Sequence, residues 1–270
     1  MLPINKIYSD SRHKTSSSKS DSEFEIQLKE PISLPDNCVC VISDVILKNT
    51  ITTVESFNEN LYVRMNNIDK IVKLHNRNYI VIDLGAHVIA KINEAFRTES
   101  NPTPVEFLDD TFNSKIVIVP KGSNTLRIFT DEELKLNNVN WTGPYYDKAN
   151  MKSINSVLGN YGTSDIHVAS QPFVSGRISL QPLDYVLLSS FGLGYTSYGV
   201  REGERHIIKK IALEPYGQIA TIPLFDVSDC IPVSKMSLTR LRFMVTDPYG
   251  NIIDLHGSNI SFSILFISND

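Results

Sequence analysis

The sequence predicts a mainly β protein: a jelly-roll β-sandwich with a small inserted α+β module. Many short segments alternate between apolar and polar residues, which is the period of a half-buried strand. Turn residues separate these segments, and a helical period appears only in the middle of the chain. Two sheets packed face to face would give all of the alternating segments a shared core.

The composition is that of a globular protein. Hydrophobic residues make up 41% of the 270 residues and charged residues 21%, so a sizeable core is available. The net charge of −4 argues against a general nucleic-acid-binding protein, and we expect no sequence-specific contact with nucleic acid. No apolar run reaches the length of a membrane span, and the first residues lack the layout of a secretion signal. We therefore expect no membrane span and a protein made inside the cell without a signal peptide.

Residues 1–22 are expected to form a flexible amino-terminal arm. The serine-rich run from Thr15 to Ser22 offers nothing apolar to bury, and the simplest interpretation is a disordered terminus. The segment nevertheless has a specific start, and we expect its contacts with a neighbouring molecule to come from Ile7, Tyr8, Asp10 and Arg12.

Residues 23–82 are predicted to form the first part of the sandwich. Phe24, Ile26 and Leu28 alternate with polar residues, as in a strand with one buried face. Residues 38–47 are nearly all apolar, which indicates a strand covered on both faces. Shorter strands are expected at 61–65, 68–74 and 79–82.

Residues 83–164 are predicted to form the inserted α+β module. An amphipathic helix is expected over 85–98, where apolar residues recur at helical spacing. A capping box at residues 130–133 opens a short helix, and Gly159 ends another that covers 153–158. Strands are expected at 105–108, 114–119 and 125–129. The aromatic side chains of Trp141, Tyr145 and Tyr146 could form a ligand platform or pack within the module.

Residues 165–270 are predicted to complete the sandwich, with strands at 184–190, 206–213 and 219–225 before a closing pair. Between the first two strands, the glycine-rich loop 192–203 is superficially similar to a phosphate-binding loop. A strand follows it, however, and a phosphate cradle relies on the amino end of a helix. We therefore do not expect phosphate binding at this loop.

The closing pair of strands is the part of the fold around which the rest is organised. Turn residues at Asp247 and Gly250 follow the first strand, and Asp254 and Gly257 precede the second. In the second strand one face is wholly apolar: it carries Ile260, Phe262, Ile264 and Phe266. At an exposed edge such a strand would promote aggregation, so an earlier segment must cover it.

No residue pattern in the sequence indicates catalysis. The six histidines are scattered and lack the H-x-H pair of the cupins, which are metal enzymes on a similar barrel. The three cysteines, Cys38, Cys40 and Cys230, have no metal-ligand or redox spacing. Cys38 and Cys40 share one face of a predicted strand, and we expect them to be buried, reduced thiols. His256 lies near Asp254, but this spacing at a turn is typical of a structural role. We predict no enzyme, no cofactor, no metal and no catalytic residue.

Several stretches resemble one family of viral proteins. They are YSDSRHKT and SDSEFEIQL at the amino end, then ISLPDNCVCV, NENLYVR and GVREG, and finally LRFMVTDPYGNIIDLHGSNISFSILF. Their order and spacing resemble the penton (minor capsid) proteins of Polinton/Maverick elements, polinton-like viruses and virophages. The resemblance implies a jelly-roll virion protein that forms homopentamers at the vertices of an icosahedral capsid. It also implies contact with the major capsid protein.

An alternative function remains open at this level. The same scaffold could be a lectin-like module that binds a glycan or a host receptor, with Trp141, Tyr195 and Tyr198 stacking on a sugar. Binding to a glycan array by a monomeric protein would favour this function, whereas ring formation without glycan binding would favour the capsid function.

Overall fold

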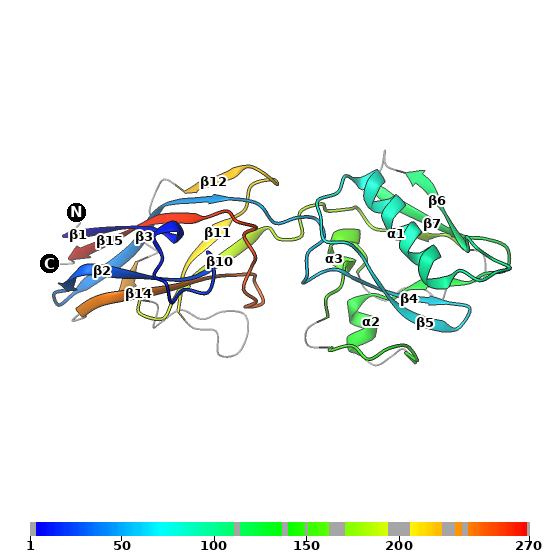
Figure 1. Cartoon of the computed structure of the whole chain (residues 1–270), viewed down its shortest axis with the longest axis horizontal. Coiled ribbons are helices and arrows are strands. Elements are labelled where there is room, and N and C mark those ends of the chain that lie inside the picture. Colours follow the sequence, from blue (N-terminus) through cyan, green and yellow to red (C-terminus); the bar gives the residue numbers. More distant parts are fainter. Residues whose placement is uncertain are drawn as a thin grey trace. The chain divides into compact units, whose positions relative to one another are not determined.

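The computed structural model of the chain describes residues 4–110, 114–136, 140–148, 151–161, 171–193, 206–222, 230–233 and 237–268. The chain divides into two compact units. Unit 1 consists of Met1–Ile51 and Leu183–Asp270, and unit 2 is the continuous segment Thr52–Pro182. The protein is mainly β, with antiparallel strands in both units (Figure 1).

Unit 1 is a β-sandwich of two antiparallel sheets. The first sheet has the strand order β1-β15-β3-β12, and β13 also pairs with β3. These strands are β1 (Asn5–Asp10), β3 (Cys38–Lys48), β12 (Ile219–Ile222), β13 (Ile231–Pro232) and β15 (Ile260–Ser268). The second sheet has the order β11-β10-β14-β2. Its strands are β2 (Glu23–Ser33), β10 (Tyr185–Ser190), β11 (Ile207–Ala212) and β14 (Ser237–Thr246).

Aromatic side chains from both sheets meet in the core of unit 1. The ring centroid of Phe243 on β14 lies 5.3 Å from that of Phe24 on β2, its neighbour in the same sheet. It also lies 5.0 Å from that of Phe262 on β15, in the opposite sheet, with the rings edge to face. The inward positions predicted from the alternating pattern are therefore the ones that join the two sheets.

The prediction that β15 must lie inside a sheet is confirmed. The strand pairs with β1 on one side and with β3 on the other. The four apolar residues of its inner face are almost fully buried: Ile260, Phe262, Ile264 and Phe266. The segment that covers one edge of β15 comes from the start of the sequence, and Figure 1 shows the first and last strands side by side.

The expectation of a flexible arm over residues 1–22 is therefore corrected for the part that the structure describes. Residues 5–10 form a regular strand whose register runs from Asn5 opposite Phe266 to Asp10 opposite Ser261. Ile7 is buried on the inner face of this strand. The backbone hydrogen bonds to β15 and the burial of Ile7 offset the entropy lost on ordering, which the polar composition alone did not predict.

Unit 2 contains two small antiparallel sheets, with strand orders β5-β4-β8 and β6-β7-β9. Its strands are β4 (Asn60–Met65), β5 (Ile68–Lys73), β6 (Val105–Asp110), β7 (Lys115–Pro120), β8 (Leu126–Ile128) and β9 (Phe173–Val174). Helix α1 (Val81–Phe96) packs against strands of both sheets, and its apolar face contributes Leu84, Val88 and Ile92 to a shared core. Two short helices complete the unit, α2 (Asp131–Lys135) and α3 (Asn155–Leu158).

The boundaries of the insertion differ from the expected 83–164. The hairpin β4–β5 was expected in the sandwich, but β4 pairs with β8, so the hairpin belongs to unit 2. At the other end β9 pairs with β7, which extends unit 2 to Pro182. Residues 79–82 are not a strand: they form a loop and the first turn of α1. These differences all come from pairings between residues far apart in the sequence.

Two predicted helix boundaries of the module are confirmed, the start of α2 and the end of α3, whereas the helix expected over 85–98 runs from Val81 to Phe96. Thr130 accepts a hydrogen bond from the Glu133 backbone, and the Glu133 side chain accepts one from the Thr130 backbone, as in a capping box. Gly159 ends α3 in the left-handed region, with φ of 61°. Within the described ranges, no helix is both long and apolar enough to span a membrane.

Candidate functional site

The exposed side of β1 is the first candidate surface. Tyr8 is 76% exposed, and the Lys6 ammonium lies 4.6 Å from the centre of its ring. Lys6 also forms an ion pair of 3.2 Å with Asp44 on β3. Of the four expected contact residues, Tyr8 and Arg12 face solvent, whereas Ile7 lies in the core.

Asp10, the fourth expected contact residue, orients Arg12. It caps a short 3-10 helix (η1, Ser11–His13) by accepting a hydrogen bond of 2.9 Å from the Arg12 backbone N–H. The Arg12 guanidinium donates to both carboxylate oxygens of Asp10, at 3.0 Å from Nε and 2.6 Å from Nη2. These hydrogen bonds lower the pKa of Asp10 below its usual value, despite partial burial. The result is an exposed guanidinium held at a fixed position beside the end of β1.

The serine-rich segment that follows lies along the edge of β2. The Ser18 and Ser20 hydroxyls each accept a hydrogen bond of 2.9 Å, from the backbone N–H groups of Glu25 and Glu23 respectively. The Thr15 backbone N–H donates to the Glu25 carbonyl at 2.8 Å. Serine side chains thus take the place of a neighbouring strand at the first residues of β2.

The predicted turn residues after β14 have structural roles. Asp247 is buried, and its Oδ1 accepts hydrogen bonds from the backbone N–H groups of Tyr249 and Asn251 at 2.8 and 2.9 Å. Gly250 has φ of 85°, a conformation that favours glycine. Asp254 accepts a bond of 2.7 Å from the His256 backbone, and Gly257 has φ of 76°. These residues shape the connection between β14 and β15, which agrees with a structural role for His256.

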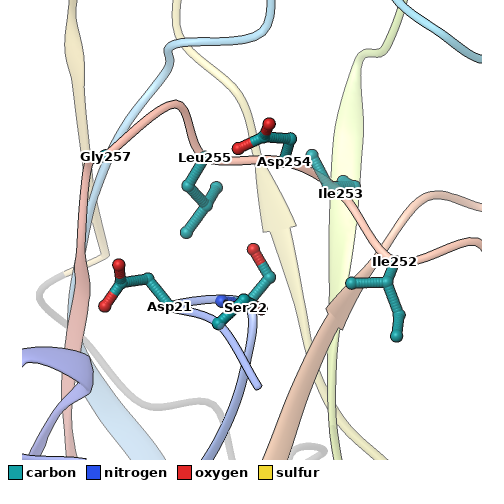
Figure 2. A pocket seen from close by; sticks show the side chains of 8 residues that line it. Asp21, Ser22, Ile252, Ile253, Asp254, Leu255 and Gly257 are labelled. Atoms are coloured by element: carbon teal, nitrogen blue, oxygen red, sulfur yellow. Dashed lines mark hydrogen bonds between the residues drawn. The ribbon is translucent and has the colours of Figure 1, made fainter. Parts of the chain in front are cut away.

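The connection to β15 and the serine-rich segment together line an open hollow of about 350 Å³ (Figure 2). It is lined by Ser20, Asp21, Ser22, Ile252, Ile253, Asp254, Leu255 and Gly257. Figure 2 shows Leu255 pointing toward the segment that carries Asp21 and Ser22. Asp21 already pairs with Lys14 at 2.6 Å, so this carboxylate is neutralised by a residue of the same segment.

The cysteines and other metal-ligating side chains form no metal site among the described residues. No three histidine, cysteine, aspartate or glutamate side chains gather there to hold a metal ion. Cys38 and Cys40 are buried and free of disulfides, as expected. Burial raises the pKa of Cys40 to about 12, so its thiol is protonated near neutral pH and is a poor nucleophile.

The aromatic cluster of unit 2 is packed. The Trp141 ring meets the rings of Tyr62, Phe129 and Tyr146 edge to face, at centroid distances of 5.8, 5.5 and 5.8 Å. Its indole N–H donates to the Pro144 carbonyl at 2.9 Å. These contacts favour the packing interpretation for Trp141 and Tyr146, whereas Tyr145 is 90% exposed. The glycine-rich loop that carries Tyr195 and Tyr198 lies outside the described residues.

The sequence reasoning missed a pair of histidines in unit 2. His75, after β5, and His87, on α1, have ring centroids 4.8 Å apart. The two histidines are twelve residues apart, one after a strand and one in a helix, and this spacing matches no known motif. Only the packing of the loop on the helix reveals the pair.

Comparison with known proteins gives one structural likeness to report. No family model matches the chain, and no curated protein matches it. Among solved structures, the crystal structure of the mavirus penton protein is similar to the chain, with 12% sequence identity and a TM-score of 0.49. The match covers 98% of this chain and 99% of that one.

Proposed function

We propose that the protein is a structural virion protein: a penton (minor capsid) subunit built on a jelly roll, which forms pentamers at the vertices of an icosahedral capsid. One observation carries most weight. The amino-terminal and carboxyl-terminal stretches that resemble penton proteins are far apart in the sequence, yet they are paired as β1 and β15. If the two stretches resembled penton proteins only by chance, nothing would require them to pair in one sheet.

Pentamer formation requires two different surfaces on each subunit. A closed ring of five copies uses a head-to-tail interface, in which one patch contacts a different patch on the next copy. We propose that Tyr8 and Arg12 belong to one of these patches. Both are exposed and both are held in place, Tyr8 by its strand and Arg12 by Asp10, so little side-chain entropy would be lost on binding.

The mass of the purified chain in solution tests this function. Size-exclusion chromatography with light scattering, over a series of concentrations, should detect a species of five chains, and negative-stain images should show five-fold rings. Addition of the major capsid protein of the same genetic element should favour the assembled form, because contacts at a vertex raise the local concentration. A strictly monomeric chain that the major capsid protein does not retain would contradict the proposal.

Variants of the exposed residues locate the interface. The double substitution Tyr8→Ala with Arg12→Ala should reduce pentamer formation at least tenfold, while circular dichroism stays unchanged. Tyr145→Ala in unit 2 is a matched control, because Tyr145 is 90% exposed and belongs to no proposed patch. If the double variant assembled as well as the control, these residues would not form the interface, even if the chain were a penton subunit.

A further inference from the structure

The loop between β5 and α1 is attached to the helix through His87. The His75 backbone N–H donates a hydrogen bond of 3.2 Å to His87 Nε2. The centroid of the His87 ring lies 4.8 Å from that of the His75 ring and 5.4 Å from that of the Tyr79 ring, and both neighbours belong to this loop. Two aromatic rings and one backbone amide of the loop therefore converge on one imidazole.

This geometry specifies the protonation state of His87. A nitrogen that accepts a hydrogen bond needs its lone pair, so Nε2 carries no proton and the imidazole is neutral when the bond forms. Protonation at Nε2 would turn the acceptor into a donor that faces another donor, the His75 N–H. The hydrogen bond and the imidazolium form of His87 are mutually exclusive.

The surroundings of His87 disfavour a positive charge. Partial burial is the main reason that its pKa lies below the ordinary value of 6.5, and His75, Arg77 and Lys91 lower it further. Glu94 acts in the opposite direction, but it forms an ion pair of 2.8 Å with Lys91. The groups facing His87 from the loop and from the helix are thus mostly cationic or aromatic.

The loop holds other contacts that depend on its position. The Tyr79 hydroxyl donates to the His75 carbonyl at 3.0 Å, and the Arg77 guanidinium lies 4.4 Å from the centre of the Tyr79 ring. The Tyr79 backbone N–H donates to the Thr53 hydroxyl at 3.2 Å, which connects the loop to the first residues of unit 2. Arg77 also forms an isolated β-bridge with Val54. Movement of the loop away from α1 would weaken all of these contacts at once.

We propose that His87 is a pH-sensitive switch in unit 2: the neutral imidazole holds the loop of residues 75–79 on α1, and its protonation releases this loop. The loop then exposes Tyr79 and loosens the contacts with residues 53 and 54. The proposal does not depend on the proposed capsid function, because it concerns contacts within one chain.

The sign of the pH dependence follows from linkage. The unfolded or released state binds a proton at His87 near pH 6.5, whereas the folded state binds it only at lower pH. The contribution of His87 to stability is therefore complete above pH 6.5, and it decreases as the pH falls from 6.5 to the lowered pKa of the folded state.

Hydrogen exchange on the full chain tests the switch. NMR titration of the imidazole resonances should place the pKa of His87 below the ordinary value of 6.5. The protection of the His75 amide, corrected for intrinsic exchange, should be constant near neutral pH. Between pH 6.5 and the lowered pKa of His87 it should fall by up to about tenfold per pH unit, and below that pKa it should level off.

Three variants separate the switch from general acid sensitivity. His87→Gln keeps an acceptor near Nε2 but cannot be protonated, so protection of the His75 amide should no longer depend on pH. His87→Arg carries a permanent charge and should show low protection even at neutral pH. His256→Gln, in unit 1, should behave as the wild type. Unchanged protection of the wild type down to about pH 5, or the same loss in His87→Gln, would overturn the proposal.

Discussion

At the scale of single residues, stability depends on side chains that connect segments far apart in the sequence. Phe262 joins the two sheets of unit 1, and Asp69 joins a hairpin of unit 2 to the segment around Trp141. The Asp69 carboxylate is fully buried and accepts hydrogen bonds from Arg64 at 2.6 Å and from the Thr142 backbone at 2.6 Å. Such residues have a larger effect on stability than any exposed ion pair.

Phe262→Ala should destabilise unit 1 by about 3–5 kcal/mol, because it removes a buried ring and leaves a cavity between the sheets. Chemical denaturation followed by far-UV circular dichroism measures the change in the free energy of unfolding. Phe191→Ala serves as a control, since Phe191 is about half exposed and its loss should cost less than about 1 kcal/mol. Equal costs for the two variants would contradict the proposed role of Phe262.

Asp69→Ala should destabilise unit 2 by about 3–5 kcal/mol, because it leaves Arg64 without its buried partner. Burial raises the pKa of Asp69, but the bonds from Arg64 and Thr142 outweigh this effect and lower the pKa overall. The wild type should therefore keep this stabilisation above the unfolded pKa of about 3.9 and lose it as the pH falls through the lower folded value. Melting curves recorded at several pH values should show this loss of stability in the wild type and should lack it in Asp69→Ala.

At the scale of elements, patterns within one strand or helix were predictable and pairings between elements were not. The alternation in β14 and β15 identified which face is buried, and the capping box at Thr130 identified the start of α2. The start of α1 was missed because residues 79–82 are β-branched or aromatic, and Ile80 provides no side-chain cap. Packing of the apolar face of the helix overrides this local preference.

The amino-terminal segment illustrates a second limit of pattern reading. Its serines form hydrogen bonds with the edge of β2, an interaction that hydrophobic periodicity does not detect. For the candidate site, the sequence identified the exposed Tyr8 and Arg12 but also named Ile7, which is buried. The difference depends on the pairing of β1 with β15, and no local pattern fixes that pairing.

Deletion of residues 1–10 should lower the melting temperature of unit 1 by roughly 5–10 °C, because the burial of Ile7 and the cover of β15 are lost. The truncated chain should also aggregate more readily, since one edge of β15 becomes unpaired. Differential scanning calorimetry and light scattering measure the two effects. An unchanged melting temperature would indicate that the segment is a loose arm after all.

At the scale of the whole molecule, the two units differ in continuity. Unit 2 is one uninterrupted segment with its own core, whereas unit 1 combines both ends of the sequence. Residues 52–182 expressed alone should therefore fold, which dispersed amide resonances and a cooperative melt would demonstrate. A molten or insoluble fragment would mean that unit 2 requires unit 1. The same fragment provides a second setting for the His87 switch, free of any assembly.

The pairing of β1 with β15 has a consequence for synthesis on the ribosome. The sheet of unit 1 that contains β15 cannot form until this strand has been translated, although β1 and β3 emerge from the ribosome first. Unit 2 can fold in the interval, because all of its strands are complete by then. During that interval β3 lacks a partner strand on the side that β15 will take, and a chaperone that binds extended apolar segments would be most effective there. The strand β15, whose inner face is wholly apolar, is made late, when both of its neighbours are already present.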